Sequence, residues 1–337
     1  MVGFFRGLLT LLFLLAILAV GAVAFFADPD VPAADLLAKY GPQPPSRFAD
    51  LPTGARAHYR DQGQAQGLPL ILLHGSNASL HTWEPWVAEL GDQFRLISVD
   101  LPGHGLTGAV PGDDYSQEGM VTFVAAFASA LGLERFALAG NSMGGAVAAR
   151  FALTAPDRLT HLILIDAGGM PTKTPTDPGL GFRLARIPVL QYALLYVTPR
   201  YLFEEGLKKA VVDDALVTPE MVDRYWQLNR RVGTRQALLK RFQIAQVGFL
   251  EANADKIATP TLILWGDLDT LTPRDMGEAY AQAIKGAKLV IYKNVGHLPM
   301  EEAPAQSARA LREFLAPTPV APEVTEEAAP AGGPPPP

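Results

Sequence analysis

The chain has 337 residues, 49% of them hydrophobic, and a formal net charge of −6 at neutral pH. The length suits one large domain or two small ones, and the acidic balance gives no indication of nucleic-acid binding. The absence of cysteine excludes disulfides, thiolate catalysis and cysteine-ligated metal sites.

The N-terminal segment, residues 1–27, holds about twenty uncharged, mostly apolar residues between Arg6 and Asp28. A helix of that length measures roughly 30 Å, the thickness of a bilayer core. Because a basic residue precedes the stretch and acidic residues follow it, we predict a transmembrane helix that anchors the chain in a membrane. The rest of the chain is then extracytoplasmic, on the periplasmic side in a bacterium. A signal segment cleaved near 22–24 is the alternative, which would give a secreted protein.

Residues 28–45 are predicted to form a linker to the first domain. At the other end, residues 316–337 are rich in proline and alanine and show no hydrophobic periodicity. A segment with so little to bury is predicted to be a disordered tail.

The middle of the chain alternates between apolar runs and helical patterns. A hairpin is predicted first, followed by six buried strands, and the alternation with helices predicts a mostly parallel sheet covered on both faces. The chemistry of such a sheet lies at the carboxyl ends of its strands. The predicted strands lie within 46–52, 55–63, 68–75, 94–105, 136–142, 160–169, 260–269 and 287–297, and the predicted helices are 116–133, 144–154, 274–284 and 303–315.

Residues 170–248 interrupt this alternation and are helical in texture. They fall between two predicted strands, so we expect a helical cap above a core made of residues 46–169 and 249–315. Aromatic side chains of the cap are expected to line the site and set acyl specificity; the alternative is that they only pack the cap onto the core. They are Tyr192, Tyr196, Tyr201, Phe203, Tyr225 and Trp226.

The stretch "FALAGNSMGGAVAARFA" places Ser142 between a predicted strand and a predicted helix, with Gly140 and Gly144 two residues to either side. A strand joined to a helix with almost no loop makes a sharp turn, and the glycines remove Cβ atoms that would collide there. The serine hydroxyl is then exposed beside the first N–H groups of the helix. The pattern predicts a nucleophilic serine; a strand-to-helix loop with small residues for packing is the alternative.

A serine nucleophile needs a general base, and His297 follows the last predicted strand, where it can reach Ser142. The base needs a carboxylate that fixes its tautomer. Asp267 and Asp269 both follow a strand, and Asp269 is preferred because it lies deeper in the loop, just before the helix. Asp166, at the end of another strand, is the reserve candidate.

Five motifs occur in order over roughly residues 46–315: "LLHGSNAS", "DLPGHGLT", "GNSMGG", "LWGDLDTLTP" and "GHLPMEEAP". With these motifs the chain resembles the α/β-hydrolase family, in its capped branch with a serine nucleophile. The resemblance implies an α/β-hydrolase fold with an eight-stranded, mostly parallel sheet. It also implies that Ser142 is the nucleophile, Asp269 the acid and His297 the base.

The same resemblance implies that the backbone N–H groups of Ser76 and Met143 form the oxyanion hole. His74 and His104 are then structural residues of their loops. The reaction needs no metal and no organic cofactor. The implied substrate is a small-molecule or lipid ester, the membrane is a partner through the N-terminal helix, and no oligomeric state is implied.

The expected activity is that of a carboxylic-ester hydrolase, esterase-like or lipase-like, acting through an acyl-enzyme. Asparagine before the serine also resembles the carbon–carbon bond hydrolases of the meta-cleavage type. Those enzymes usually carry a more glycine-rich "HG" loop and a tryptophan after the catalytic histidine, where this chain has Leu298. A non-enzymatic binding protein with a retained pocket is the third hypothesis.

Overall fold

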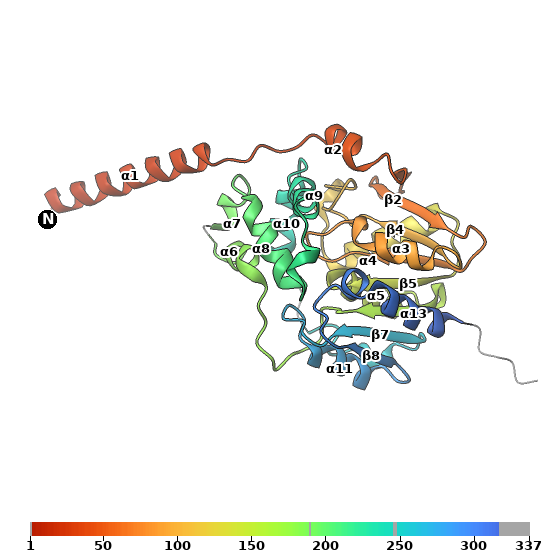
Figure 1. The fold of residues 1–337 in the computed structure, drawn as a ribbon. Coiled ribbons are helices and arrows are strands. Elements are labelled where there is room, and N and C mark those ends of the chain that lie inside the picture. The colour runs from red at the N-terminus through yellow and green to blue at the C-terminus, as the bar shows by residue number, and fades with distance from the viewer. Residues whose placement is uncertain (1, 189, 245–247, 317–337) are drawn as a thin grey trace, which may run out of the picture.

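The structure is a computed structural model that describes residues 2–188, 190–244 and 248–316. Its centre is an eight-stranded sheet in the order β1-β2-β4-β3-β5-β6-β7-β8 (Figure 1). β2 pairs antiparallel with β1 and β4, and the other neighbouring strands are parallel. This confirms the predicted sheet. The strands are β1 (Arg47–Asp50), β2 (Arg56–Gly63), β3 (Pro69–Leu73), β4 (Arg95–Val99), β5 (Phe136–Asn141), β6 (Leu159–Ile165), β7 (Thr261–Gly266) and β8 (Lys288–Tyr292).

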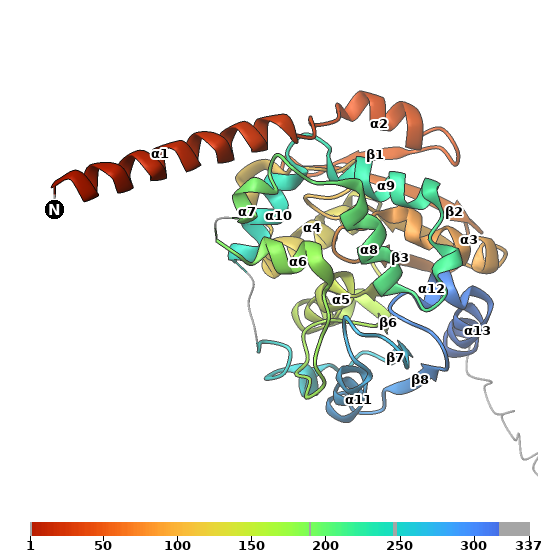
Figure 2. The ribbon, with the colours of Figure 1, turned by 60° about the vertical axis from the view of Figure 1, so that its left-hand side comes forward.

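Helices cover both faces of the sheet, because successive strand residues point to opposite sides and both sides are apolar. In β3, Ile71 and Leu73 belong to one apolar core, and Leu70 and Leu72 to a second. The turned view in Figure 2 shows the two helical layers. The first core includes α4 (Gln117–Ala130), α5 (Met143–Thr154) and α11 (Arg274–Ala283); the second includes α3 (Glu84–Leu90), α12 (Pro299–Glu302) and α13 (Pro304–Leu315).

The four predicted core helices are present within a few residues of their predicted bounds, but α3 and α12 were not predicted. With seven and four residues, they are too short to show a helical period. Single turns of 3₁₀ helix add further connections at Leu80–Trp83, Pro111–Asp113, Pro156–Arg158, Asp214–Leu216 and Ala254–Lys256.

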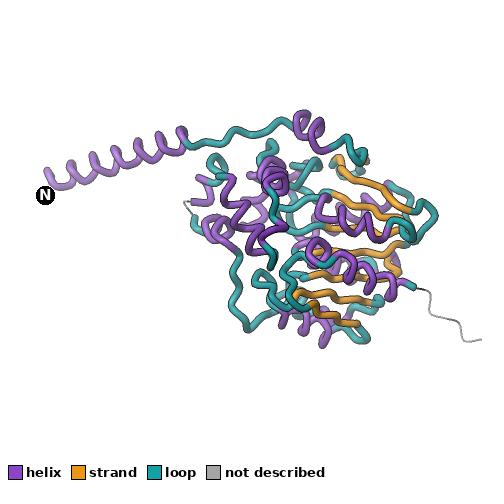
Figure 3. Tube along the Cα trace, viewed as in Figure 1, coloured by secondary structure: helices purple, strands orange, loops and turns teal. Residues whose placement is uncertain are grey.

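Between β6 and β7 the described chain forms helices only, as the sequence predicted. Figure 3 shows them gathered at one end of the strands. They are α6 (Gly179–Ala185), α7 (Leu190–Ala193), α8 (Arg200–Ala210), α9 (Pro219–Asn229) and α10 (Thr234–Gln243), and they are called the cap below.

The N-terminal segment forms helix α1 (Val2–Phe25), which extends away from the rest of the molecule in both ribbon views. Within the residues that the structure describes, however, no helix combines the length and the apolar character needed to cross a membrane. The helix was predicted correctly, but the structure does not support its prediction as a transmembrane span.

Residues 28–45 were predicted as a linker but contain helix α2 (Ala33–Tyr40) and are bound to the cap. Leu36 packs with Leu228 of the cap, which gives α2 an apolar anchor. Just before it, Arg235 of α10 donates to the Asp30 carboxylate at 2.6 Å, and the Asp28 N–H donates to a cap carbonyl at 2.7 Å. The segment is therefore an ordered strap. The predicted tail lies outside the described residues, apart from Ala316.

Candidate active site

Ser142 lies at the turn between β5 and α5, with φ 54° and ψ −117°. A left-handed φ is unusual for a residue with a side chain and stores strain, so the surroundings must hold it. They do so through the backbone: the Ser142 N–H donates to the Ile165 carbonyl at 3.0 Å, and the Ser142 carbonyl accepts the N–H groups of Ala146 and Gly168. The turn predicted from the sequence is present.

The two glycines that flank this turn leave no space for side chains. A Cβ on Gly140 would lie 2.2 Å from the Gly144 carbonyl oxygen, and a Cβ on Gly144 would lie 2.3 Å from the Leu73 carbonyl oxygen. Both obstacles are backbone atoms, one in α5 and one in β3, and cannot turn aside. The spacing of the glycines around Ser142 is therefore a requirement of the close approach of α5 to β3 and β5.

The turn of Ser142 lies at the point in the sheet where the order of the strands reverses. β5 lies next to β3, whereas β4 lies on the other side of β3, so the loops after β3 and β5 leave the sheet side by side. A Cβ on Gly75 would be 3.1 Å from the Ser142 Cβ. Ser76 follows Gly75, and Met143 is the first residue of α5, so both predicted oxyanion residues border the turn. Ligand sites of parallel sheets form at such switch points.

His297 and Asp269 form a buried pair. Nδ1 of His297 lies 2.7 Å from Oδ2 of Asp269. The Asp269 carboxylate also accepts the N–H groups of Leu271 and Thr272, at 2.7 and 3.1 Å, and the Thr272 hydroxyl at 2.5 Å. Burial would raise the pKa of Asp269, but the neighbouring imidazole and these hydrogen bonds outweigh it, so the pKa is lowered. The ionised carboxylate keeps the imidazole proton on Nδ1 and leaves Nε2 free.

Asp267, the competing acid, lies outside this arrangement. It accepts the Asn294 N–H at 2.8 Å and lies 3.3 Å from the Lys293 ammonium. Its carboxylate thus connects the loop after β7 to the loop after β8, and it has no hydrogen bond to His297. The structure thus pairs His297 with Asp269, and Ser142 and His297 line the same pocket.

Asp166, the reserve acid, is fully buried and has a left-handed φ of 42°. Burial raises its pKa well above the usual range, and the nearby charge of Asp269 raises it further. One carboxyl oxygen accepts the Gly266 N–H at 3.0 Å. Burial and the neighbouring carboxylate thus favour the protonated form of Asp166.

Asp166, Asp269 and His297 are also the described group that could hold a metal ion, with ligand atoms within 4.8 Å of one another. Metal ligands must be deprotonated. The raised pKa of Asp166 opposes metal binding, and the Asp269 carboxylate is already hydrogen-bonded to the imidazole. The donor set therefore suits proton transfer better than a cation.

Asn141 has a positional role that the sequence did not reveal. Its side-chain amide is buried and donates to the backbone carbonyl of His297 at 3.0 Å and to that of Ile165 at 3.3 Å. The residue before the serine thus holds the loop that carries the histidine. The sequence pattern drew attention to this asparagine only as a resemblance to carbon–carbon bond hydrolases.

The two loop histidines, His74 and His104, have structural roles, as the resemblance implied. Nδ1 of His74 donates to the Gly75 carbonyl at 2.7 Å, and its Nε2 accepts the Leu101 N–H at 3.0 Å. Nδ1 of His104 lies 2.9 Å from the Pro102 carbonyl, so its proton is there. Burial lowers the pKa of both rings. Neither is placed to act as the base for Ser142.

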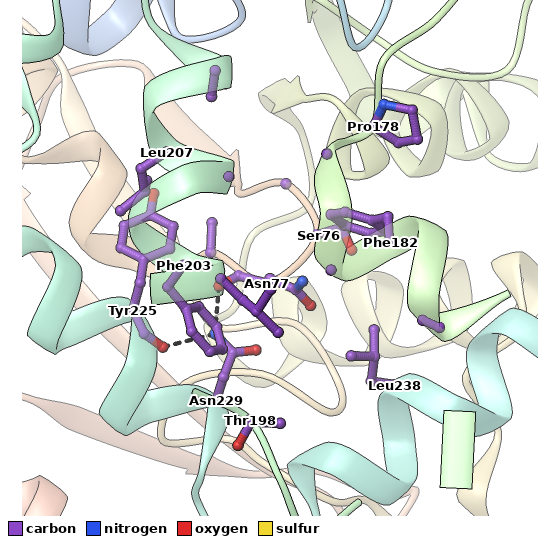
Figure 4. Close-up of a pocket in the computed structure, with 18 of the residues that line it drawn as sticks. Ser76, Asn77, Pro178, Phe182, Thr198, Phe203, Leu207, Tyr225, Asn229 and Leu238 are labelled. Atoms are coloured by element: carbon purple, nitrogen blue, oxygen red, sulfur yellow. Dashed lines mark hydrogen bonds between the residues drawn. The ribbon is translucent and has the colours of Figure 1, made fainter. Parts of the chain in front are cut away.

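An apolar pocket lies between the core and the cap, and Ser142 and His297 both line it. Figure 4 shows Phe182, Phe203 and Leu238 of three cap helices around it, with Ser76 and Asn77 of the loop after β3. Polar side chains border one part of the pocket: the Asn229 amide donates to the Asn77 carbonyl at 2.7 Å and to the Tyr225 carbonyl at 2.9 Å. The pocket is concave and mostly apolar, as small-molecule sites are.

The cap aromatics divide into two groups, which corrects the sequence-based expectation. Phe203 and Tyr225 line the pocket. Tyr192, Tyr196 and Tyr201 are more than half exposed and do not line it. The remaining one, the Trp226 indole, donates to a carbonyl within the cap at 2.8 Å. In helices this short, the sequence pattern does not show which face lines the pocket and which face is exposed. Phe182 and Phe242, which were not predicted, complete the aromatic lining.

Comparisons with known proteins agree with this geometry. The family model described as "alpha/beta hydrolase fold" matches residues 69–304. The 2-hydroxy-6-oxo-2,4-heptadienoate hydrolase of Pseudomonas putida is 27% identical over 274 residues, covering 78% of this chain and 94% of that enzyme. The monoacylglycerol lipase abhd6-A of Xenopus laevis is 28% identical over 263 residues, covering 73% and 74%.

A solved structure is similar over nearly the whole chain. The crystal structure of a membrane phospholipase A, described as a bacterial virulence factor, is 27% identical with a TM-score of 0.69, and the match covers 92% of this chain and 97% of that one. Fold alone does not fix an activity, and these relatives differ in theirs. The family model, however, spans more than half of the sequence, and the chain belongs to the alpha/beta hydrolase fold family.

Proposed function

We propose that the protein is a carboxylic-ester hydrolase that works through a Ser142–His297–Asp269 triad and an acyl-enzyme. The observation that carries the proposal is the buried 2.7 Å contact between His297 and Asp269 beside the strained turn of Ser142. A serine, an oriented imidazole and a carboxylate in this order are the parts that nucleophilic acyl transfer needs.

In the proposed mechanism, Ser142 Oγ attacks the ester carbonyl while Nε2 of His297 takes its proton. Asp269 stabilises the imidazolium that forms. The backbone N–H groups of Ser76 and Met143 donate to the oxyanion of the tetrahedral intermediate. His297 then protonates the leaving alcohol, and a water molecule that gives its proton to the same nitrogen releases the acid from Ser142.

The lining of the pocket supports an apolar acyl group on the substrate. The lining offers little polar surface, as at Phe182, Phe203 and Leu238. Burial of a long acyl chain there would stabilise the complex by about 0.8 kcal/mol for each CH₂ group. The relatives that hydrolyse lipid esters by name, a monoacylglycerol lipase and a phospholipase A, agree with this direction. We therefore propose small-molecule or lipid esters as substrates.

Carbon–carbon bond hydrolysis is the second candidate, because Asn141 precedes the serine and a relative carries that activity in its name. A panel of p-nitrophenyl esters of different acyl length, and a meta-cleavage product followed by its visible absorbance, separates the two. The ester proposal expects turnover of the esters that disappears in Ser142→Ala. Turnover of the dienoate alone would favour the alternative, and ligand binding without any turnover would favour a binding protein.

We also propose that the hydrolase part acts outside the cytoplasm, on the basis of Arg6 before the apolar N-terminal segment and the acidic residues after it. Protease accessibility in intact cells tests the location, and N-terminal sequencing of the mature protein tests whether the segment is retained. If the hydrolase part stays protected from an added protease that reaches the outer face of the cytoplasmic membrane of intact cells, the proposal is contradicted.

A further inference from the structure

Arg241, in the last turn of cap helix α10, reaches across to the two loops of the core that border Ser142. Its guanidinium donates to the hydroxyl of Ser76, lies 3.1 Å from Sδ of Met143 and lies 2.7 Å from Nε2 of His104. Ser76 and Met143 come from different loops, after β3 and after β5. One cap side chain therefore contacts both residues to which the oxyanion N–H groups belong.

The charge on this side chain has no counterion among the described residues. Burial lowers the pKa of Arg241 to about 10. The guanidinium is still protonated at neutral pH. Its acceptor on His104 is neutral, because burial and the guanidinium lower the pKa of that ring and its proton is on Nδ1. A partly buried positive charge without a partner is unfavourable in the resting protein.

We propose that Arg241 is a positioning residue of the oxyanion hole, which ties the loops of Ser76 and Met143 to the cap and adds positive charge where the oxyanion forms. The inference rests on the proposed ester hydrolysis. It makes the cap part of the chemistry as well as of substrate selection, since the hole is held in place only while α10 is docked.

This placement predicts an effect on the chemical step more than on binding. The substrate carbonyl is nearly neutral in the ground state, and negative charge develops on its oxygen only in the transition state. Fixed donors and charges aimed at that position therefore act on kcat. The Arg241 contacts are made to side chains of the donor residues, so the arginine acts through Ser76 and Met143 and does not itself touch the substrate.

The first test compares Arg241→Met, which keeps the length of the side chain but removes charge and donors, with Arg241→Lys, which keeps the charge. Lys240→Gln is the matched control, because this neighbour on α10 is an exposed cation paired with Asp113 on the surface. We expect Arg241→Met to lower kcat by about 10- to 100-fold with KM changed by less than about threefold, Arg241→Lys to recover part of the loss, and Lys240→Gln to equal wild type.

The second test is a double-mutant cycle with Ser76→Ala, which removes the hydroxyl but keeps the backbone N–H. If Arg241 acts through the Ser76 hydroxyl, Arg241→Met should lower kcat clearly less in the Ser76→Ala background than in wild type. Thermal melts of every variant check that the cap remains folded. A merely structural role would give equal losses in both backgrounds and no recovery by lysine.

Unchanged kcat in a folded Arg241→Met variant, a loss confined to KM, or strict additivity with Ser76→Ala would each overturn the inference, while leaving the proposed function intact as long as Ser142→Ala is inactive. Wild-type ester turnover that survives in Ser142→Ala would instead overturn the proposed function, and the inference with it.

Discussion

The carboxyl edge of the sheet and the cap hold the pocket from opposite sides and are built differently. At the edge, polar atoms have fixed partners: the Asp269 carboxylate accepts four hydrogen bonds, and the Asn141 amide donates two. In the cap, the pocket wall is apolar and partly buried. Phe182 and Phe203 line it with apolar surface that many side chains could supply.

Substitutions are therefore expected to be tolerated differently in the two regions. A hydrogen-bonded side chain has one partner at one distance, so the loss of a single atom is felt in full. An apolar wall acts through its area, so the loss of one ring is partly compensated by neighbours and depends on the ligand. Changes at the edge should therefore affect all substrates alike, and changes in the cap should affect some more than others.

Asp269→Asn should reduce activity more than any other variant considered at the edge or in the cap. An amide in this place stabilises the wrong imidazole tautomer, and kcat should fall by about 10³- to 10⁴-fold for every ester. Asp267→Asn is the matched control, since that carboxylate contacts Lys293 and the Asn294 N–H but not the imidazole, and it should stay within about twofold of wild type. Equal losses in the two variants, or a comparable loss in Asp166→Asn, would show that the acid is assigned to the wrong residue.

A pair of glycine substitutions compares the stability of the two regions. Gly144→Ala places a Cβ against backbone oxygens of β3, and we expect the free energy of unfolding to drop by about 3 kcal/mol. Gly206→Ala, inside cap helix α8, meets no atom within 4 Å and should raise it by up to about 1 kcal/mol, because alanine favours the helix. Urea unfolding of both variants measures the contrast. If the free energy of unfolding changed by a similar amount and in the same direction in both variants, the edge of the sheet would not be packed more tightly than the cap.

Selectivity should move when the pocket wall of the cap is shortened. Phe203→Ala is expected to change the ratio of kcat/KM between long and short acyl esters by about tenfold, against the long ester. Tyr201→Ala, two residues earlier on the same helix but 56% exposed, is the control and should leave the ratio unchanged. If both variants shift the ratio equally, or neither does, the cap does not select the acyl chain.

The smallest effect concerns Glu301, at the border between the regions. Burial, and the nearby Glu84 and Glu302, raise its pKa to about 7 from an ordinary 4.5, against the influence of Arg224 and a hydrogen bond from Thr82. The native state therefore holds a proton that the unfolded chain loses between pH 4.5 and 7, so this group makes stability fall as the pH rises through that window.

Glu301→Gln cannot titrate, so its free energy of unfolding should gain on that of wild type between the two ends of that window. The full shift corresponds to roughly 3 kcal/mol, and solvent screening at this partly exposed side chain should reduce the gain. Glu204→Gln on the cap surface is the control with the opposite sign, since Lys208 lowers the pKa of Glu204. Denaturation at a series of pH values gives the slopes. Parallel curves for wild type and Glu301→Gln would contradict the raised pKa.

Much of the fold was predictable because its strands are continuous apolar runs bounded by glycine and polar residues. The turn at Ser142 and the pair of His297 and Asp269 were predictable for the same reason, since each follows such a run. Asn141 and Arg241 were not, because their roles come from contacts with residues about 100 or more positions away. The strap of residues 28–45 and the two faces of the cap helices depend likewise on packing that no local pattern encodes.

The claim that the edge of the sheet carries the chemistry is tested most directly by covalent labelling. A fluorophosphonate, which reacts with activated serines, is incubated with wild type, Ser142→Ala, Asp269→Asn and Phe203→Ala, and the adduct is mapped by peptide mass spectrometry. We predict one adduct, on Ser142, in wild type and at a similar rate in Phe203→Ala, much slower labelling in Asp269→Asn, and none in Ser142→Ala. An adduct on another serine, or labelling of Ser142→Ala at the wild-type rate, would contradict the account.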